Sequence, residues 1–600
     1  MSGGWIAITD PEGKEWDLFC NGFRNQYDFA FNGDGEIVTY DSDMEWDTGM
    51  PWYRPTRINH ATSGAEFGWR HGSGKMPPYY ADTLPSIVDV GPGSPTGVVS
   101  GAGAKFPAKY QRAIYAMDWT YGTMYALHLK PSGSTYEAEK EEFLSGVPLN
   151  LSDMVVGPKD GALYFAVGGR NTQSALYRVI YEGDESTAPA DLANKDGADL
   201  RALRHSLEAF HGKEDKSAVE TAWPQLGHED RNIRFAARIA VEWQPVATWQ
   251  DKALAETNPR AAIEALIALA RHGDKALAPK VYAALEKVGF GDLDEMGQLA
   301  LIRAYGLATI RLGKPDAATA AAIAERFAPF YPNASPRLNR ELCSLFVAIG
   351  DPGVVAKTVP MMALEVAADA PRYNEALLKR NQGYGSAFGS VNESNPQGQQ
   401  IHYAYALREA TAGWTPALRK EFFGWFPRAR NFKGGASFDG FIENIRKESL
   451  AKVPDAERGE LDKLSQAPAP KAQDLTGARI INIGAKAGLL FDVTEVEAKA
   501  GEDVAIIFKN NDPSGLMHNL AIAKPGSLAQ VIKDAIALGA DGPARHFIPD
   551  TGDILHATPI VVPNASFTLR FNAPDQPGDY VIVCTYPGHG QLMNAVLRVK

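Results

Sequence analysis

A cysteine, a histidine and a methionine lie close together in the stretch CTYPGHGQLM. Cys584 is followed after four intervening residues by His589, and Met593 comes after three more. A thiolate, an imidazole and a thioether are soft or borderline ligands, the set that suits copper. Because one short loop carries all three side chains, the spacing predicts part of a copper site.

A copper ion that changes between Cu(I) and Cu(II) with little rearrangement takes two imidazoles and one thiolate in a trigonal plane, with a weak axial thioether. The loop supplies three of these four ligands. His518 stands between a glycine-containing turn and an apolar run and offers the missing imidazole. The predicted set is therefore His518, Cys584, His589 and Met593. The alternative for Cys584 is a buried core residue, the commoner role of a free cysteine.

The composition indicates a multidomain globular protein. The chain has 600 residues, enough for roughly three to five domains, and 45% apolar with 22% charged residues is ordinary for a soluble protein. The net charge of -12 is spread without a block of like charges, which argues against a nucleic-acid binder and against binding to anionic membranes. The three cysteines lie in different neighbourhoods, so a disulfide framework is not expected.

Targeting segments are not visible in the sequence. The first twenty residues have neither a positive start nor an apolar core, and no run reaches eighteen apolar residues. The sequence as written predicts a soluble chain without an export signal or a membrane span.

Residues 1–185 have the pattern of short strands. They are rich in Gly, Pro, Trp and Tyr, and strand-like runs flank Asp-Gly turns at 34–35 and 160–161, which is the signal of a β-hairpin. We interpret these residues as blades of an all-β propeller. At roughly 40 to 50 residues per blade the segment holds about three or four, too few to close a ring of six. The pattern therefore predicts a partial, N-terminally truncated propeller.

Residues 190–464 have the period of helices. Asn258 can cap a helix with Pro259 in its first turn, and Gly273 can end it. Paired amphipathic helices in series predict an α-solenoid of HEAT-like repeats. Cys343 falls on an apolar helix face and is expected in the core.

The remaining residues form a linker and a second β-domain. Residues 465–474 are rich in Pro and Ala and are predicted to be a stiff linker. Strand-like alternation resumes in residues 475–600, whose length suits one β-sandwich. The stretch GSLAQVIKDAIALGA inside it is predicted to be a helical insertion between strands.

Residues 475–600 resemble the cupredoxins of the azurin and auracyanin type. The likeness is carried by Met517-His518-Asn519 and by the CTYPGH and LM residues of the C-terminal loop. It implies a type 1 (blue) copper centre, a distant contact from the Met517 carbonyl, and an Asn519 that ties the ligand loops together. A multicopper oxidase would also need His-x-His pairs, and none of the twelve histidines is paired in this way.

Residues 5–181 resemble the propellers of the glucose/sorbosone dehydrogenases. Five stretches follow in the family's order: NGFRNQYDFAFN, DSDMEWD, SGAEFGWR, GPGSPTG and GALYFAVGGRNTQSALYRV. Soluble glucose dehydrogenases among these relatives use pyrroloquinoline quinone with calcium. The resemblance implies that Arg24 and Asn25 contact the quinone and that Arg170 is a further anion contact.

The same resemblance places Asp41, Asp43 and Glu45 in or beside a calcium site. The alternatives are that the arginine-asparagine turn only braces the propeller and that the acidic run is a solvated loop. His60 and His128 are expected to be structural. No residue matches the family's catalytic histidine, so the catalytic residues stay unknown.

Together the two resemblances predict an oxidoreductase that oxidises a sugar or a related alcohol or aldehyde and passes electrons singly through copper to a redox partner protein. One alternative is an electron carrier or docking protein whose propeller is catalytically inactive. A further alternative is a scaffold that binds carbohydrate or protein. Copper and quinone enzymes of these families work outside the cytoplasm, so a periplasmic or otherwise extracytoplasmic location is expected, with the export signal lost with the missing N-terminus.

Overall fold

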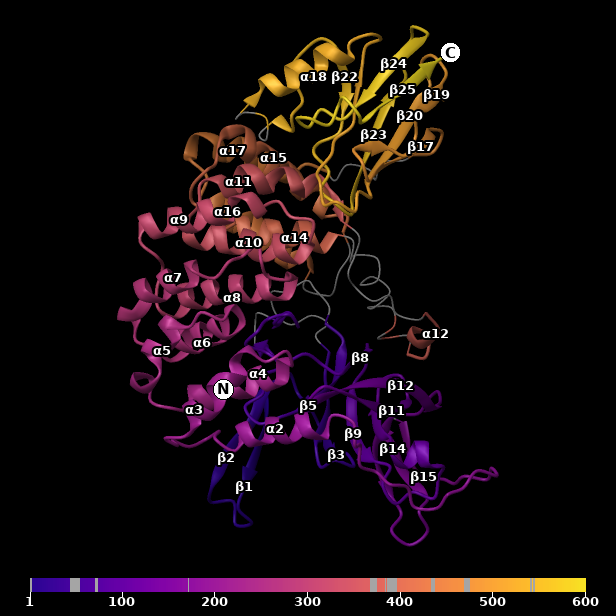
Figure 1. The fold of residues 1–600 in the computed structure, drawn as a ribbon. Coiled ribbons are helices and arrows are strands. Elements are labelled where there is room, and N and C mark those ends of the chain that lie inside the picture. Colours follow the sequence, from indigo (N-terminus) through magenta and orange to yellow (C-terminus); the bar gives the residue numbers. More distant parts are fainter. Residues whose placement is uncertain are drawn as a thin grey trace. The chain divides into compact units, whose positions relative to one another are not determined.

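Figure 1 shows the helices and strands of the computed structural model. Its chain divides into two compact units. The first unit comprises residues 1–315, 371–393 and 434–441, and the second comprises residues 316–370, 394–433 and 442–600. The structure describes residues 3–43, 54–70, 74–170, 172–366, 375–381, 383, 385, 397–432, 438–468, 475–539, 542 and 545–600. Each unit is described by itself.

The N-terminal part of the first unit consists of separate antiparallel sheets. A hairpin sheet and a four-stranded sheet come first, made of β1 (Gly4–Thr9), β2 (Trp16–Phe23), β3 (Phe29–Phe31), β4 (Ile37–Asp41), β5 (Thr56–Ala61) and β8 (Val88–Gly91). A short pair joins β6 (Trp69–Arg70) to β7 (Gly74–Lys75). A second four-stranded sheet and a three-stranded sheet follow, made of β9 (Pro95–Ser100), β10 (Ile114–Asp118), β11 (Thr123–Ser132), β12 (Thr135–Ser145), β13 (Leu151–Val156), β14 (Leu163–Gly169) and β15 (Thr172–Val179). A one-turn helix, α1 (Ala108–Gln111), lies between β9 and β10.

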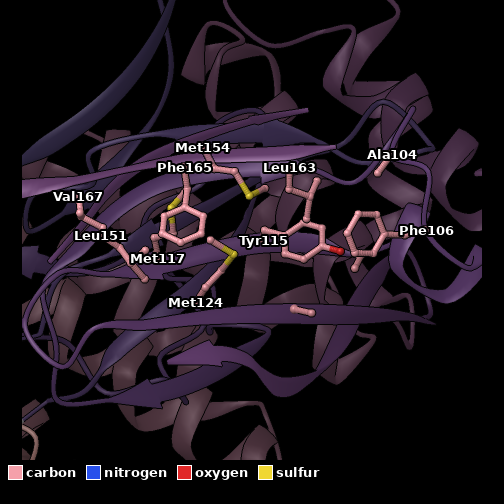
Figure 2. Packing of buried hydrophobic residues seen from close by; sticks show 12 residues of the cluster. Ala104, Phe106, Tyr115, Met117, Met124, Leu151, Met154, Leu163, Phe165 and Val167 are labelled. Carbon is pink, nitrogen blue, oxygen red and sulfur yellow. The ribbon is translucent and has the colours of Figure 1, made fainter. Parts of the chain in front are cut away.

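Apolar side chains from neighbouring sheets form the core of this part. Met117 and Met124 of one sheet pack with Leu151 and Phe165 of the next, and all four are buried (Figure 2). Each such side chain contributes about 1.5–3 kcal/mol by leaving water. Face-to-face burial of this kind holds successive sheets together.

The predicted hairpins are present, but the propeller is not confirmed. β3 pairs with β4 across the first Asp-Gly turn, and β13 pairs with β14 across the second. The sheets resemble blades in size and in antiparallel order. Among the described residues, however, no closed ring of sheets is formed.

Helices follow in the first unit. They are α2 (Ala198–Glu208), α3 (Ala218–Ala222), α4 (Arg231–Glu242), α5 (Gln250–Ala255), α6 (Pro259–His272), α7 (Ala278–Glu286), α8 (Glu295–Arg311) and the one-turn α12 (Glu375–Leu378). The series α2, α4, α6 and α8 is in contact from each helix to the next. The predicted cap is confirmed, because the Asn258 side chain accepts a hydrogen bond from the Ala261 N–H and Gly273 follows the last turn.

The second unit begins with a further set of helices. They are α9 (Ala317–Phe327), α10 (Pro336–Ile349), α11 (Gly353–Thr358), α14 (Gly398–Leu407), α15 (Pro416–Ala429), α17 (Asp455–Ser465) and, from residue 442 onward, α16 (Phe438–Ala451). Cys343 is buried in α10, as expected. The helical regions are therefore confirmed, while the HEAT-like repeat class stays a prediction. Within the described residues, no helix is long and apolar enough to cross a membrane.

Two five-stranded sheets follow in the second unit. Their strands from residue 479 onward are β17 (Arg479–Lys486), β18 (Leu490–Phe491), β19 (Glu495–Ala498), β20 (Asp503–Asn510), β21 (Ala521–Ala523), β22 (Ile554–Ala557), β23 (Ala565–Asn572), β24 (Gly578–Val583) and β25 (Asn594–Val599). With β16 (Glu365–Val366) at its edge, one sheet has the order β16-β23-β20-β17-β18, and the other has the order β19-β25-β24-β21-β22. The predicted helical insertion is present as α18 (Leu528–Ala537).

A short edge strand, β16, lies within residues 190–464, for which helical repeats are predicted. β16 (Glu365–Val366) follows α11 and pairs antiparallel with β23 at Ser566 and Ala565. Two residues are too few to show the alternation of a strand, so the pattern could not reveal it. The helical part of the second unit thus covers one edge of a sandwich sheet, which would otherwise expose unpaired backbone groups.

Candidate metal centre

The candidate ligands lie where strands of the second unit end. His518 precedes β21 and exchanges backbone hydrogen bonds with Val561, at 3.2 Å and 2.7 Å. Cys584 directly follows β24, and its N–H donates to the Met593 carbonyl oxygen at 3.0 Å. Met593 in turn donates its N–H to the carbonyl of His589 at 2.9 Å. These bonds close the C-terminal loop before β25 begins.

Three side chains from these loops converge. The His518 Nδ1 is 3.9 Å from the Cys584 Sγ and 3.2 Å from the His589 Nδ1, and the Cys584 Sγ is 3.7 Å from the His589 Nδ1. Two nitrogens and one sulfur at about 2.0–2.3 Å from a common metal, in a trigonal plane, would lie about 3.5–3.8 Å apart. The donor set and its spacing therefore fit one metal ion.

Met593 and Met517, the other members of the predicted set, lie beside these three residues in the chain. Within the described residues, His518, Cys584 and His589 are the one group of three His, Cys, Asp or Glu side chains that could hold a metal ion. Met593 is fully buried at the end of the same loop. Met517 is half-buried beside His518.

Burial sets the protonation of the three side chains in the metal-free protein. It raises the pKa of the Cys584 thiol to about 11, against the backbone N–H groups of Asn519 and Tyr586, which lower it. Burial and the neighbouring His518 lower the pKa of His589 to about 4. The pKa of His518 is also lowered, chiefly by burial. Two neutral imidazoles are thus ready to donate lone pairs, and a metal must displace the thiol proton.

A carboxylate that the sequence reasoning missed stands behind His518. The Asp512 Oδ2 lies 2.9 Å from the His518 Nε2, and both side chains are fully buried. Burial by itself raises the pKa of Asp512, but hydrogen bonds from Ser514 and His518 bring it below its ordinary value. The sequence signal that could have indicated this carboxylate is the Asp-Pro-Ser-Gly stretch before the histidine, which has the composition of a turn.

Asn519 ties the two ligand loops together, as the resemblance implies. Its Nδ2 donates to the Thr585 Oγ1 at 2.6 Å and to the His546 carbonyl at 2.8 Å. The Thr585 N–H donates back to the Asn519 Oδ1 at 2.7 Å. The residue after one candidate ligand is thereby joined to the residue after another.

Aromatic rings cover one side of the centre. The Tyr586 ring lies 4.7 Å from the His589 ring, and the Phe547 ring lies 4.8 Å from Tyr586, measured between centroids. His589 is only 6% exposed, whereas Leu592 in the same loop is 59% exposed. The insertion between β21 and β22 therefore helps to exclude water from His589.

The residues predicted to bind a quinone hold the structure of a turn. The Asp41 Oδ1 accepts the backbone N–H groups of Arg24 and Asn25, at 2.9 Å and 3.2 Å, and the Arg24 side chain donates to the Asn25 Oδ1 at 3.3 Å. Asp118, at the end of β10, accepts backbone N–H groups from Ser94 and Tyr121 in a comparable way. This repeated arrangement favours the bracing alternative.

The other predicted propeller residues are not brought together as a metal site in the described part of the chain. Asp43 is buried, and Glu45 lies outside the described residues. The Arg170 guanidinium lies over the Trp119 ring at 5.3 Å. The two histidines expected to be structural have partners: His60 contacts Glu36 and Thr135, and His128 contacts Glu141.

Comparisons with known proteins match only part of the chain. No protein-family model matches the sequence. The chain is 37% identical to auracyanin-A from Chloroflexus aurantiacus over 127 residues, which are 21% of this chain and 76% of that protein. It is 32% identical to outer membrane protein H.8 from Neisseria gonorrhoeae over 109 residues, 17% of this chain and 58% of that protein.

Solved structures of similar proteins are also found. A structure of auracyanin A from Chloroflexus aurantiacus, described as a "blue" copper protein, is matched at 32% identity with a TM-score of 0.19, over 21% of this chain and 100% of that one. A reduced auracyanin from Roseiflexus castenholzii is matched at 33% identity with a TM-score of 0.19, over 21% of this chain and 98% of that one.

Proposed function

Over about a fifth of its length this chain belongs to the auracyanin family of blue copper proteins, and on this premise we propose that it carries electrons through a single type 1 copper centre. We place the family's match at residues 475–600 and treat 1–185, 190–464 and the linker 465–474 as the other parts of the chain. The placement is supported by the sandwich sheets and by the buried histidine-cysteine-histidine group in the second unit.

One observation carries the proposal: the donor atoms of His518, Cys584 and His589 lie within 4.8 Å of one another, and all three residues are buried. In the proposed site these three atoms and the Met593 thioether would hold the copper, and the Met517 carbonyl would be a more distant contact. Copper held in this way would accept and release one electron at a time with little change of geometry.

The chain itself supplies position and shielding. Hydrogen bonds of Asn519 keep the two ligand loops in register, and burial of the imidazoles keeps water away. Because the ligands are already gathered, little rearrangement is needed when the charge of the centre changes. The partner in this role is another redox protein, and we propose an extracytoplasmic location.

We favour electron transfer without a dehydrogenase activity in this chain. The quinone and calcium roles expected for Arg24, Asn25 and Asp41 have no support from the geometry, because these groups bond to one another. The proposal therefore corresponds to the alternative of an electron carrier whose β-sheet part is catalytically inactive.

The visible absorption spectrum of the full-length protein tests the proposal. Addition of Cu(II) to the metal-free protein should produce an intense thiolate-to-copper band, with one copper bound per chain. Cys584→Ser should abolish the band, and Cys343→Ser, which changes a buried cysteine of α10, should retain it. Lack of the band in the wild-type protein, or its persistence in Cys584→Ser, would overturn the proposal.

A further inference from the structure

The imidazole of His518 lies between two groups of different kinds. Its Nδ1 faces the Cys584 Sγ and the His589 Nδ1, and its Nε2 lies 2.9 Å from the Asp512 Oδ2. A carboxylate can only accept in this contact, so the Nε2 carries the proton and the Nδ1 keeps its lone pair. The carboxylate thereby selects the tautomer in which the Nδ1 can bind a metal ion.

Asp512 is held firmly in this position. Its Oδ1 accepts the N–H of Ser514 at 2.9 Å and the Ser514 hydroxyl at 2.6 Å, and its own N–H donates to the Asn510 Oδ1 at 3.1 Å. The Asn510 Nδ2 donates in turn to the carbonyl oxygens of Leu516 and Val561, at 2.8 Å and 2.9 Å. Because β20 ends at Asn510, the carboxylate is anchored to the sandwich itself.

Among the described residues, no cationic side chain neutralises the charge of Asp512. In the described part of the chain, its one basic partner is the neutral imidazole of His518, and no lysine or arginine forms an ion pair with it. A buried negative charge interacts strongly with a nearby metal because the surrounding medium screens it little. Together with the Cys584 thiolate, it would balance the two positive charges of Cu(II) and leave Cu(I) with an excess negative charge.

We propose that Asp512 is a positioning residue that orients His518 and lowers the reduction potential of the copper centre. This inference rests on the proposed function. When the centre takes up one electron from a redox partner, the buried carboxylate opposes the change from Cu(II) to Cu(I). The chain thus carries a fixed charge that makes it a stronger one-electron donor than the same four ligands would be alone.

Replacement of the Asp512 carboxylate by an amide separates the effect of its charge from the effect of its size and hydrogen bond. Asp512→Asn keeps an oxygen that can accept from the His518 Nε2 but removes the charge. We expect the copper band to persist and the Cu(I) to Cu(II) ratio at a fixed ambient potential to rise at least tenfold, which is 59 mV for a one-electron couple. Asp579→Asn is the matched control, because it removes an equal charge from an exposed residue on β24, and it should change the ratio less than twofold.

A second variant should change the Cu(I) to Cu(II) ratio in the opposite direction. Ser514→Ala removes one hydrogen bond from the Asp512 carboxylate and concentrates its charge on the histidine side, so the ratio should fall about twofold or more. Equal ratios in Asp512→Asn and Asp579→Asn would overturn the inference while the proposed function stands. Failure of the wild-type protein to form the copper band would instead remove the proposed function.

A measurement on the metal-free protein tests the positioning role even if a variant no longer binds copper. Nitrogen-15 NMR of the metal-free protein should show His518 with its proton on Nε2, and Asp512→Ala should produce a mixture of tautomers. Copper affinity of Asp512→Ala should fall about 10- to 100-fold. An unchanged tautomer in Asp512→Ala would contradict the positioning role even if the copper measurement failed.

Discussion

At the scale of single residues, the side chains beside the proposed copper ligands hold those ligands in place. Both polar atoms of the Asn519 side chain form hydrogen bonds, with Thr585 in the other ligand loop and with the His546 carbonyl in the insertion. The Asp512 carboxylate holds His518 in a similar way, by a hydrogen bond to the Nε2 of the imidazole. A ligand loop without such neighbours would have to be ordered by the metal alone, which would lower the affinity.

Asn519→Ala should therefore weaken both the fold and the site. The substitution leaves the Thr585 N–H and the His546 carbonyl without their side-chain partner, and each buried group left unpaired costs about 1–3 kcal/mol. Urea unfolding of the metal-free protein should show this loss, and chelator competition should show a copper affinity about 10- to 100-fold lower. Asn482→Ala, at an exposed position of β17, should leave both values unchanged; an equal loss there would contradict the argument.

At the scale of elements, the helix α18 packs against the ligand loop at a glycine. A Cβ atom on Gly590 would lie 2.8 Å from the Ile532 Cγ1 and 2.9 Å from the Cys584 carbonyl oxygen. Only a residue without a side chain allows the helix and the loop to approach this closely. The insertion thus packs directly against the loop that contains Cys584 and His589.

Gly590→Ala should disturb the site by overpacking. The free energy of unfolding should fall by about 1–3 kcal/mol, and the copper band should shift because the Cys584 loop must move. Gly552→Ala is the control, because its nearest neighbour would be 4.0 Å from the new Cβ. Adding Ile532→Ala to Gly590→Ala should recover part of the loss, and the absence of any recovery would show that the helix is not the obstacle.

At the scale of the whole molecule, buried charge networks join parts that are distant in sequence. In the first unit, Glu36 contacts His60 at 2.9 Å and His205 at 2.8 Å, and it forms an ion pair with Arg204. These partners come from β5 and α2, so one carboxylate links a sheet to the helical series. Burial raises the pKa of Glu36, but His60 and Arg204 outweigh it and hold the value at about 2.

This network predicts that the first unit is sensitive to acid. The folded pKa of Glu36 lies below the ordinary value of 4.5, so its contribution is complete above that value and is lost as the pH falls towards 2. The lowered pKa of His60, chiefly caused by burial, acts in the same direction. Exchange protection of α2 peptides, corrected for the intrinsic rate, should therefore fall as the pH drops from 4.5 towards about 2.

Variants show whether Glu36 causes this acid sensitivity. Glu36→Gln should lower the protection of α2 at pH 6 and make it less dependent on pH. Glu137→Gln, at an exposed position of β12, should behave as the wild-type protein does. A Glu36→Gln profile as steep as that of the wild-type protein would show that other groups cause the acid sensitivity.

The features that the sequence predicted are local in the chain. The Asp-Gly hairpins, the Asn258 cap and the α18 insertion each depend on residues within one or two turns of one another. The C-terminal loop is local too, because Cys584 and His589 lie close together in the sequence. The partial propeller was not confirmed, because a propeller is defined by how its sheets meet and not by the pattern of any strand.

The sequence by itself determined which kinds of side chain could bind copper, since residue type and short spacing already specify the chemistry of the loop. Only the tertiary structure decided what stands behind those ligands. Phe547 reaches Tyr586, and Glu365 pairs with Ser566, across distances in the chain that no periodicity spans. Such contacts follow from packing of the complete sheets, in which each close approach depends on many others.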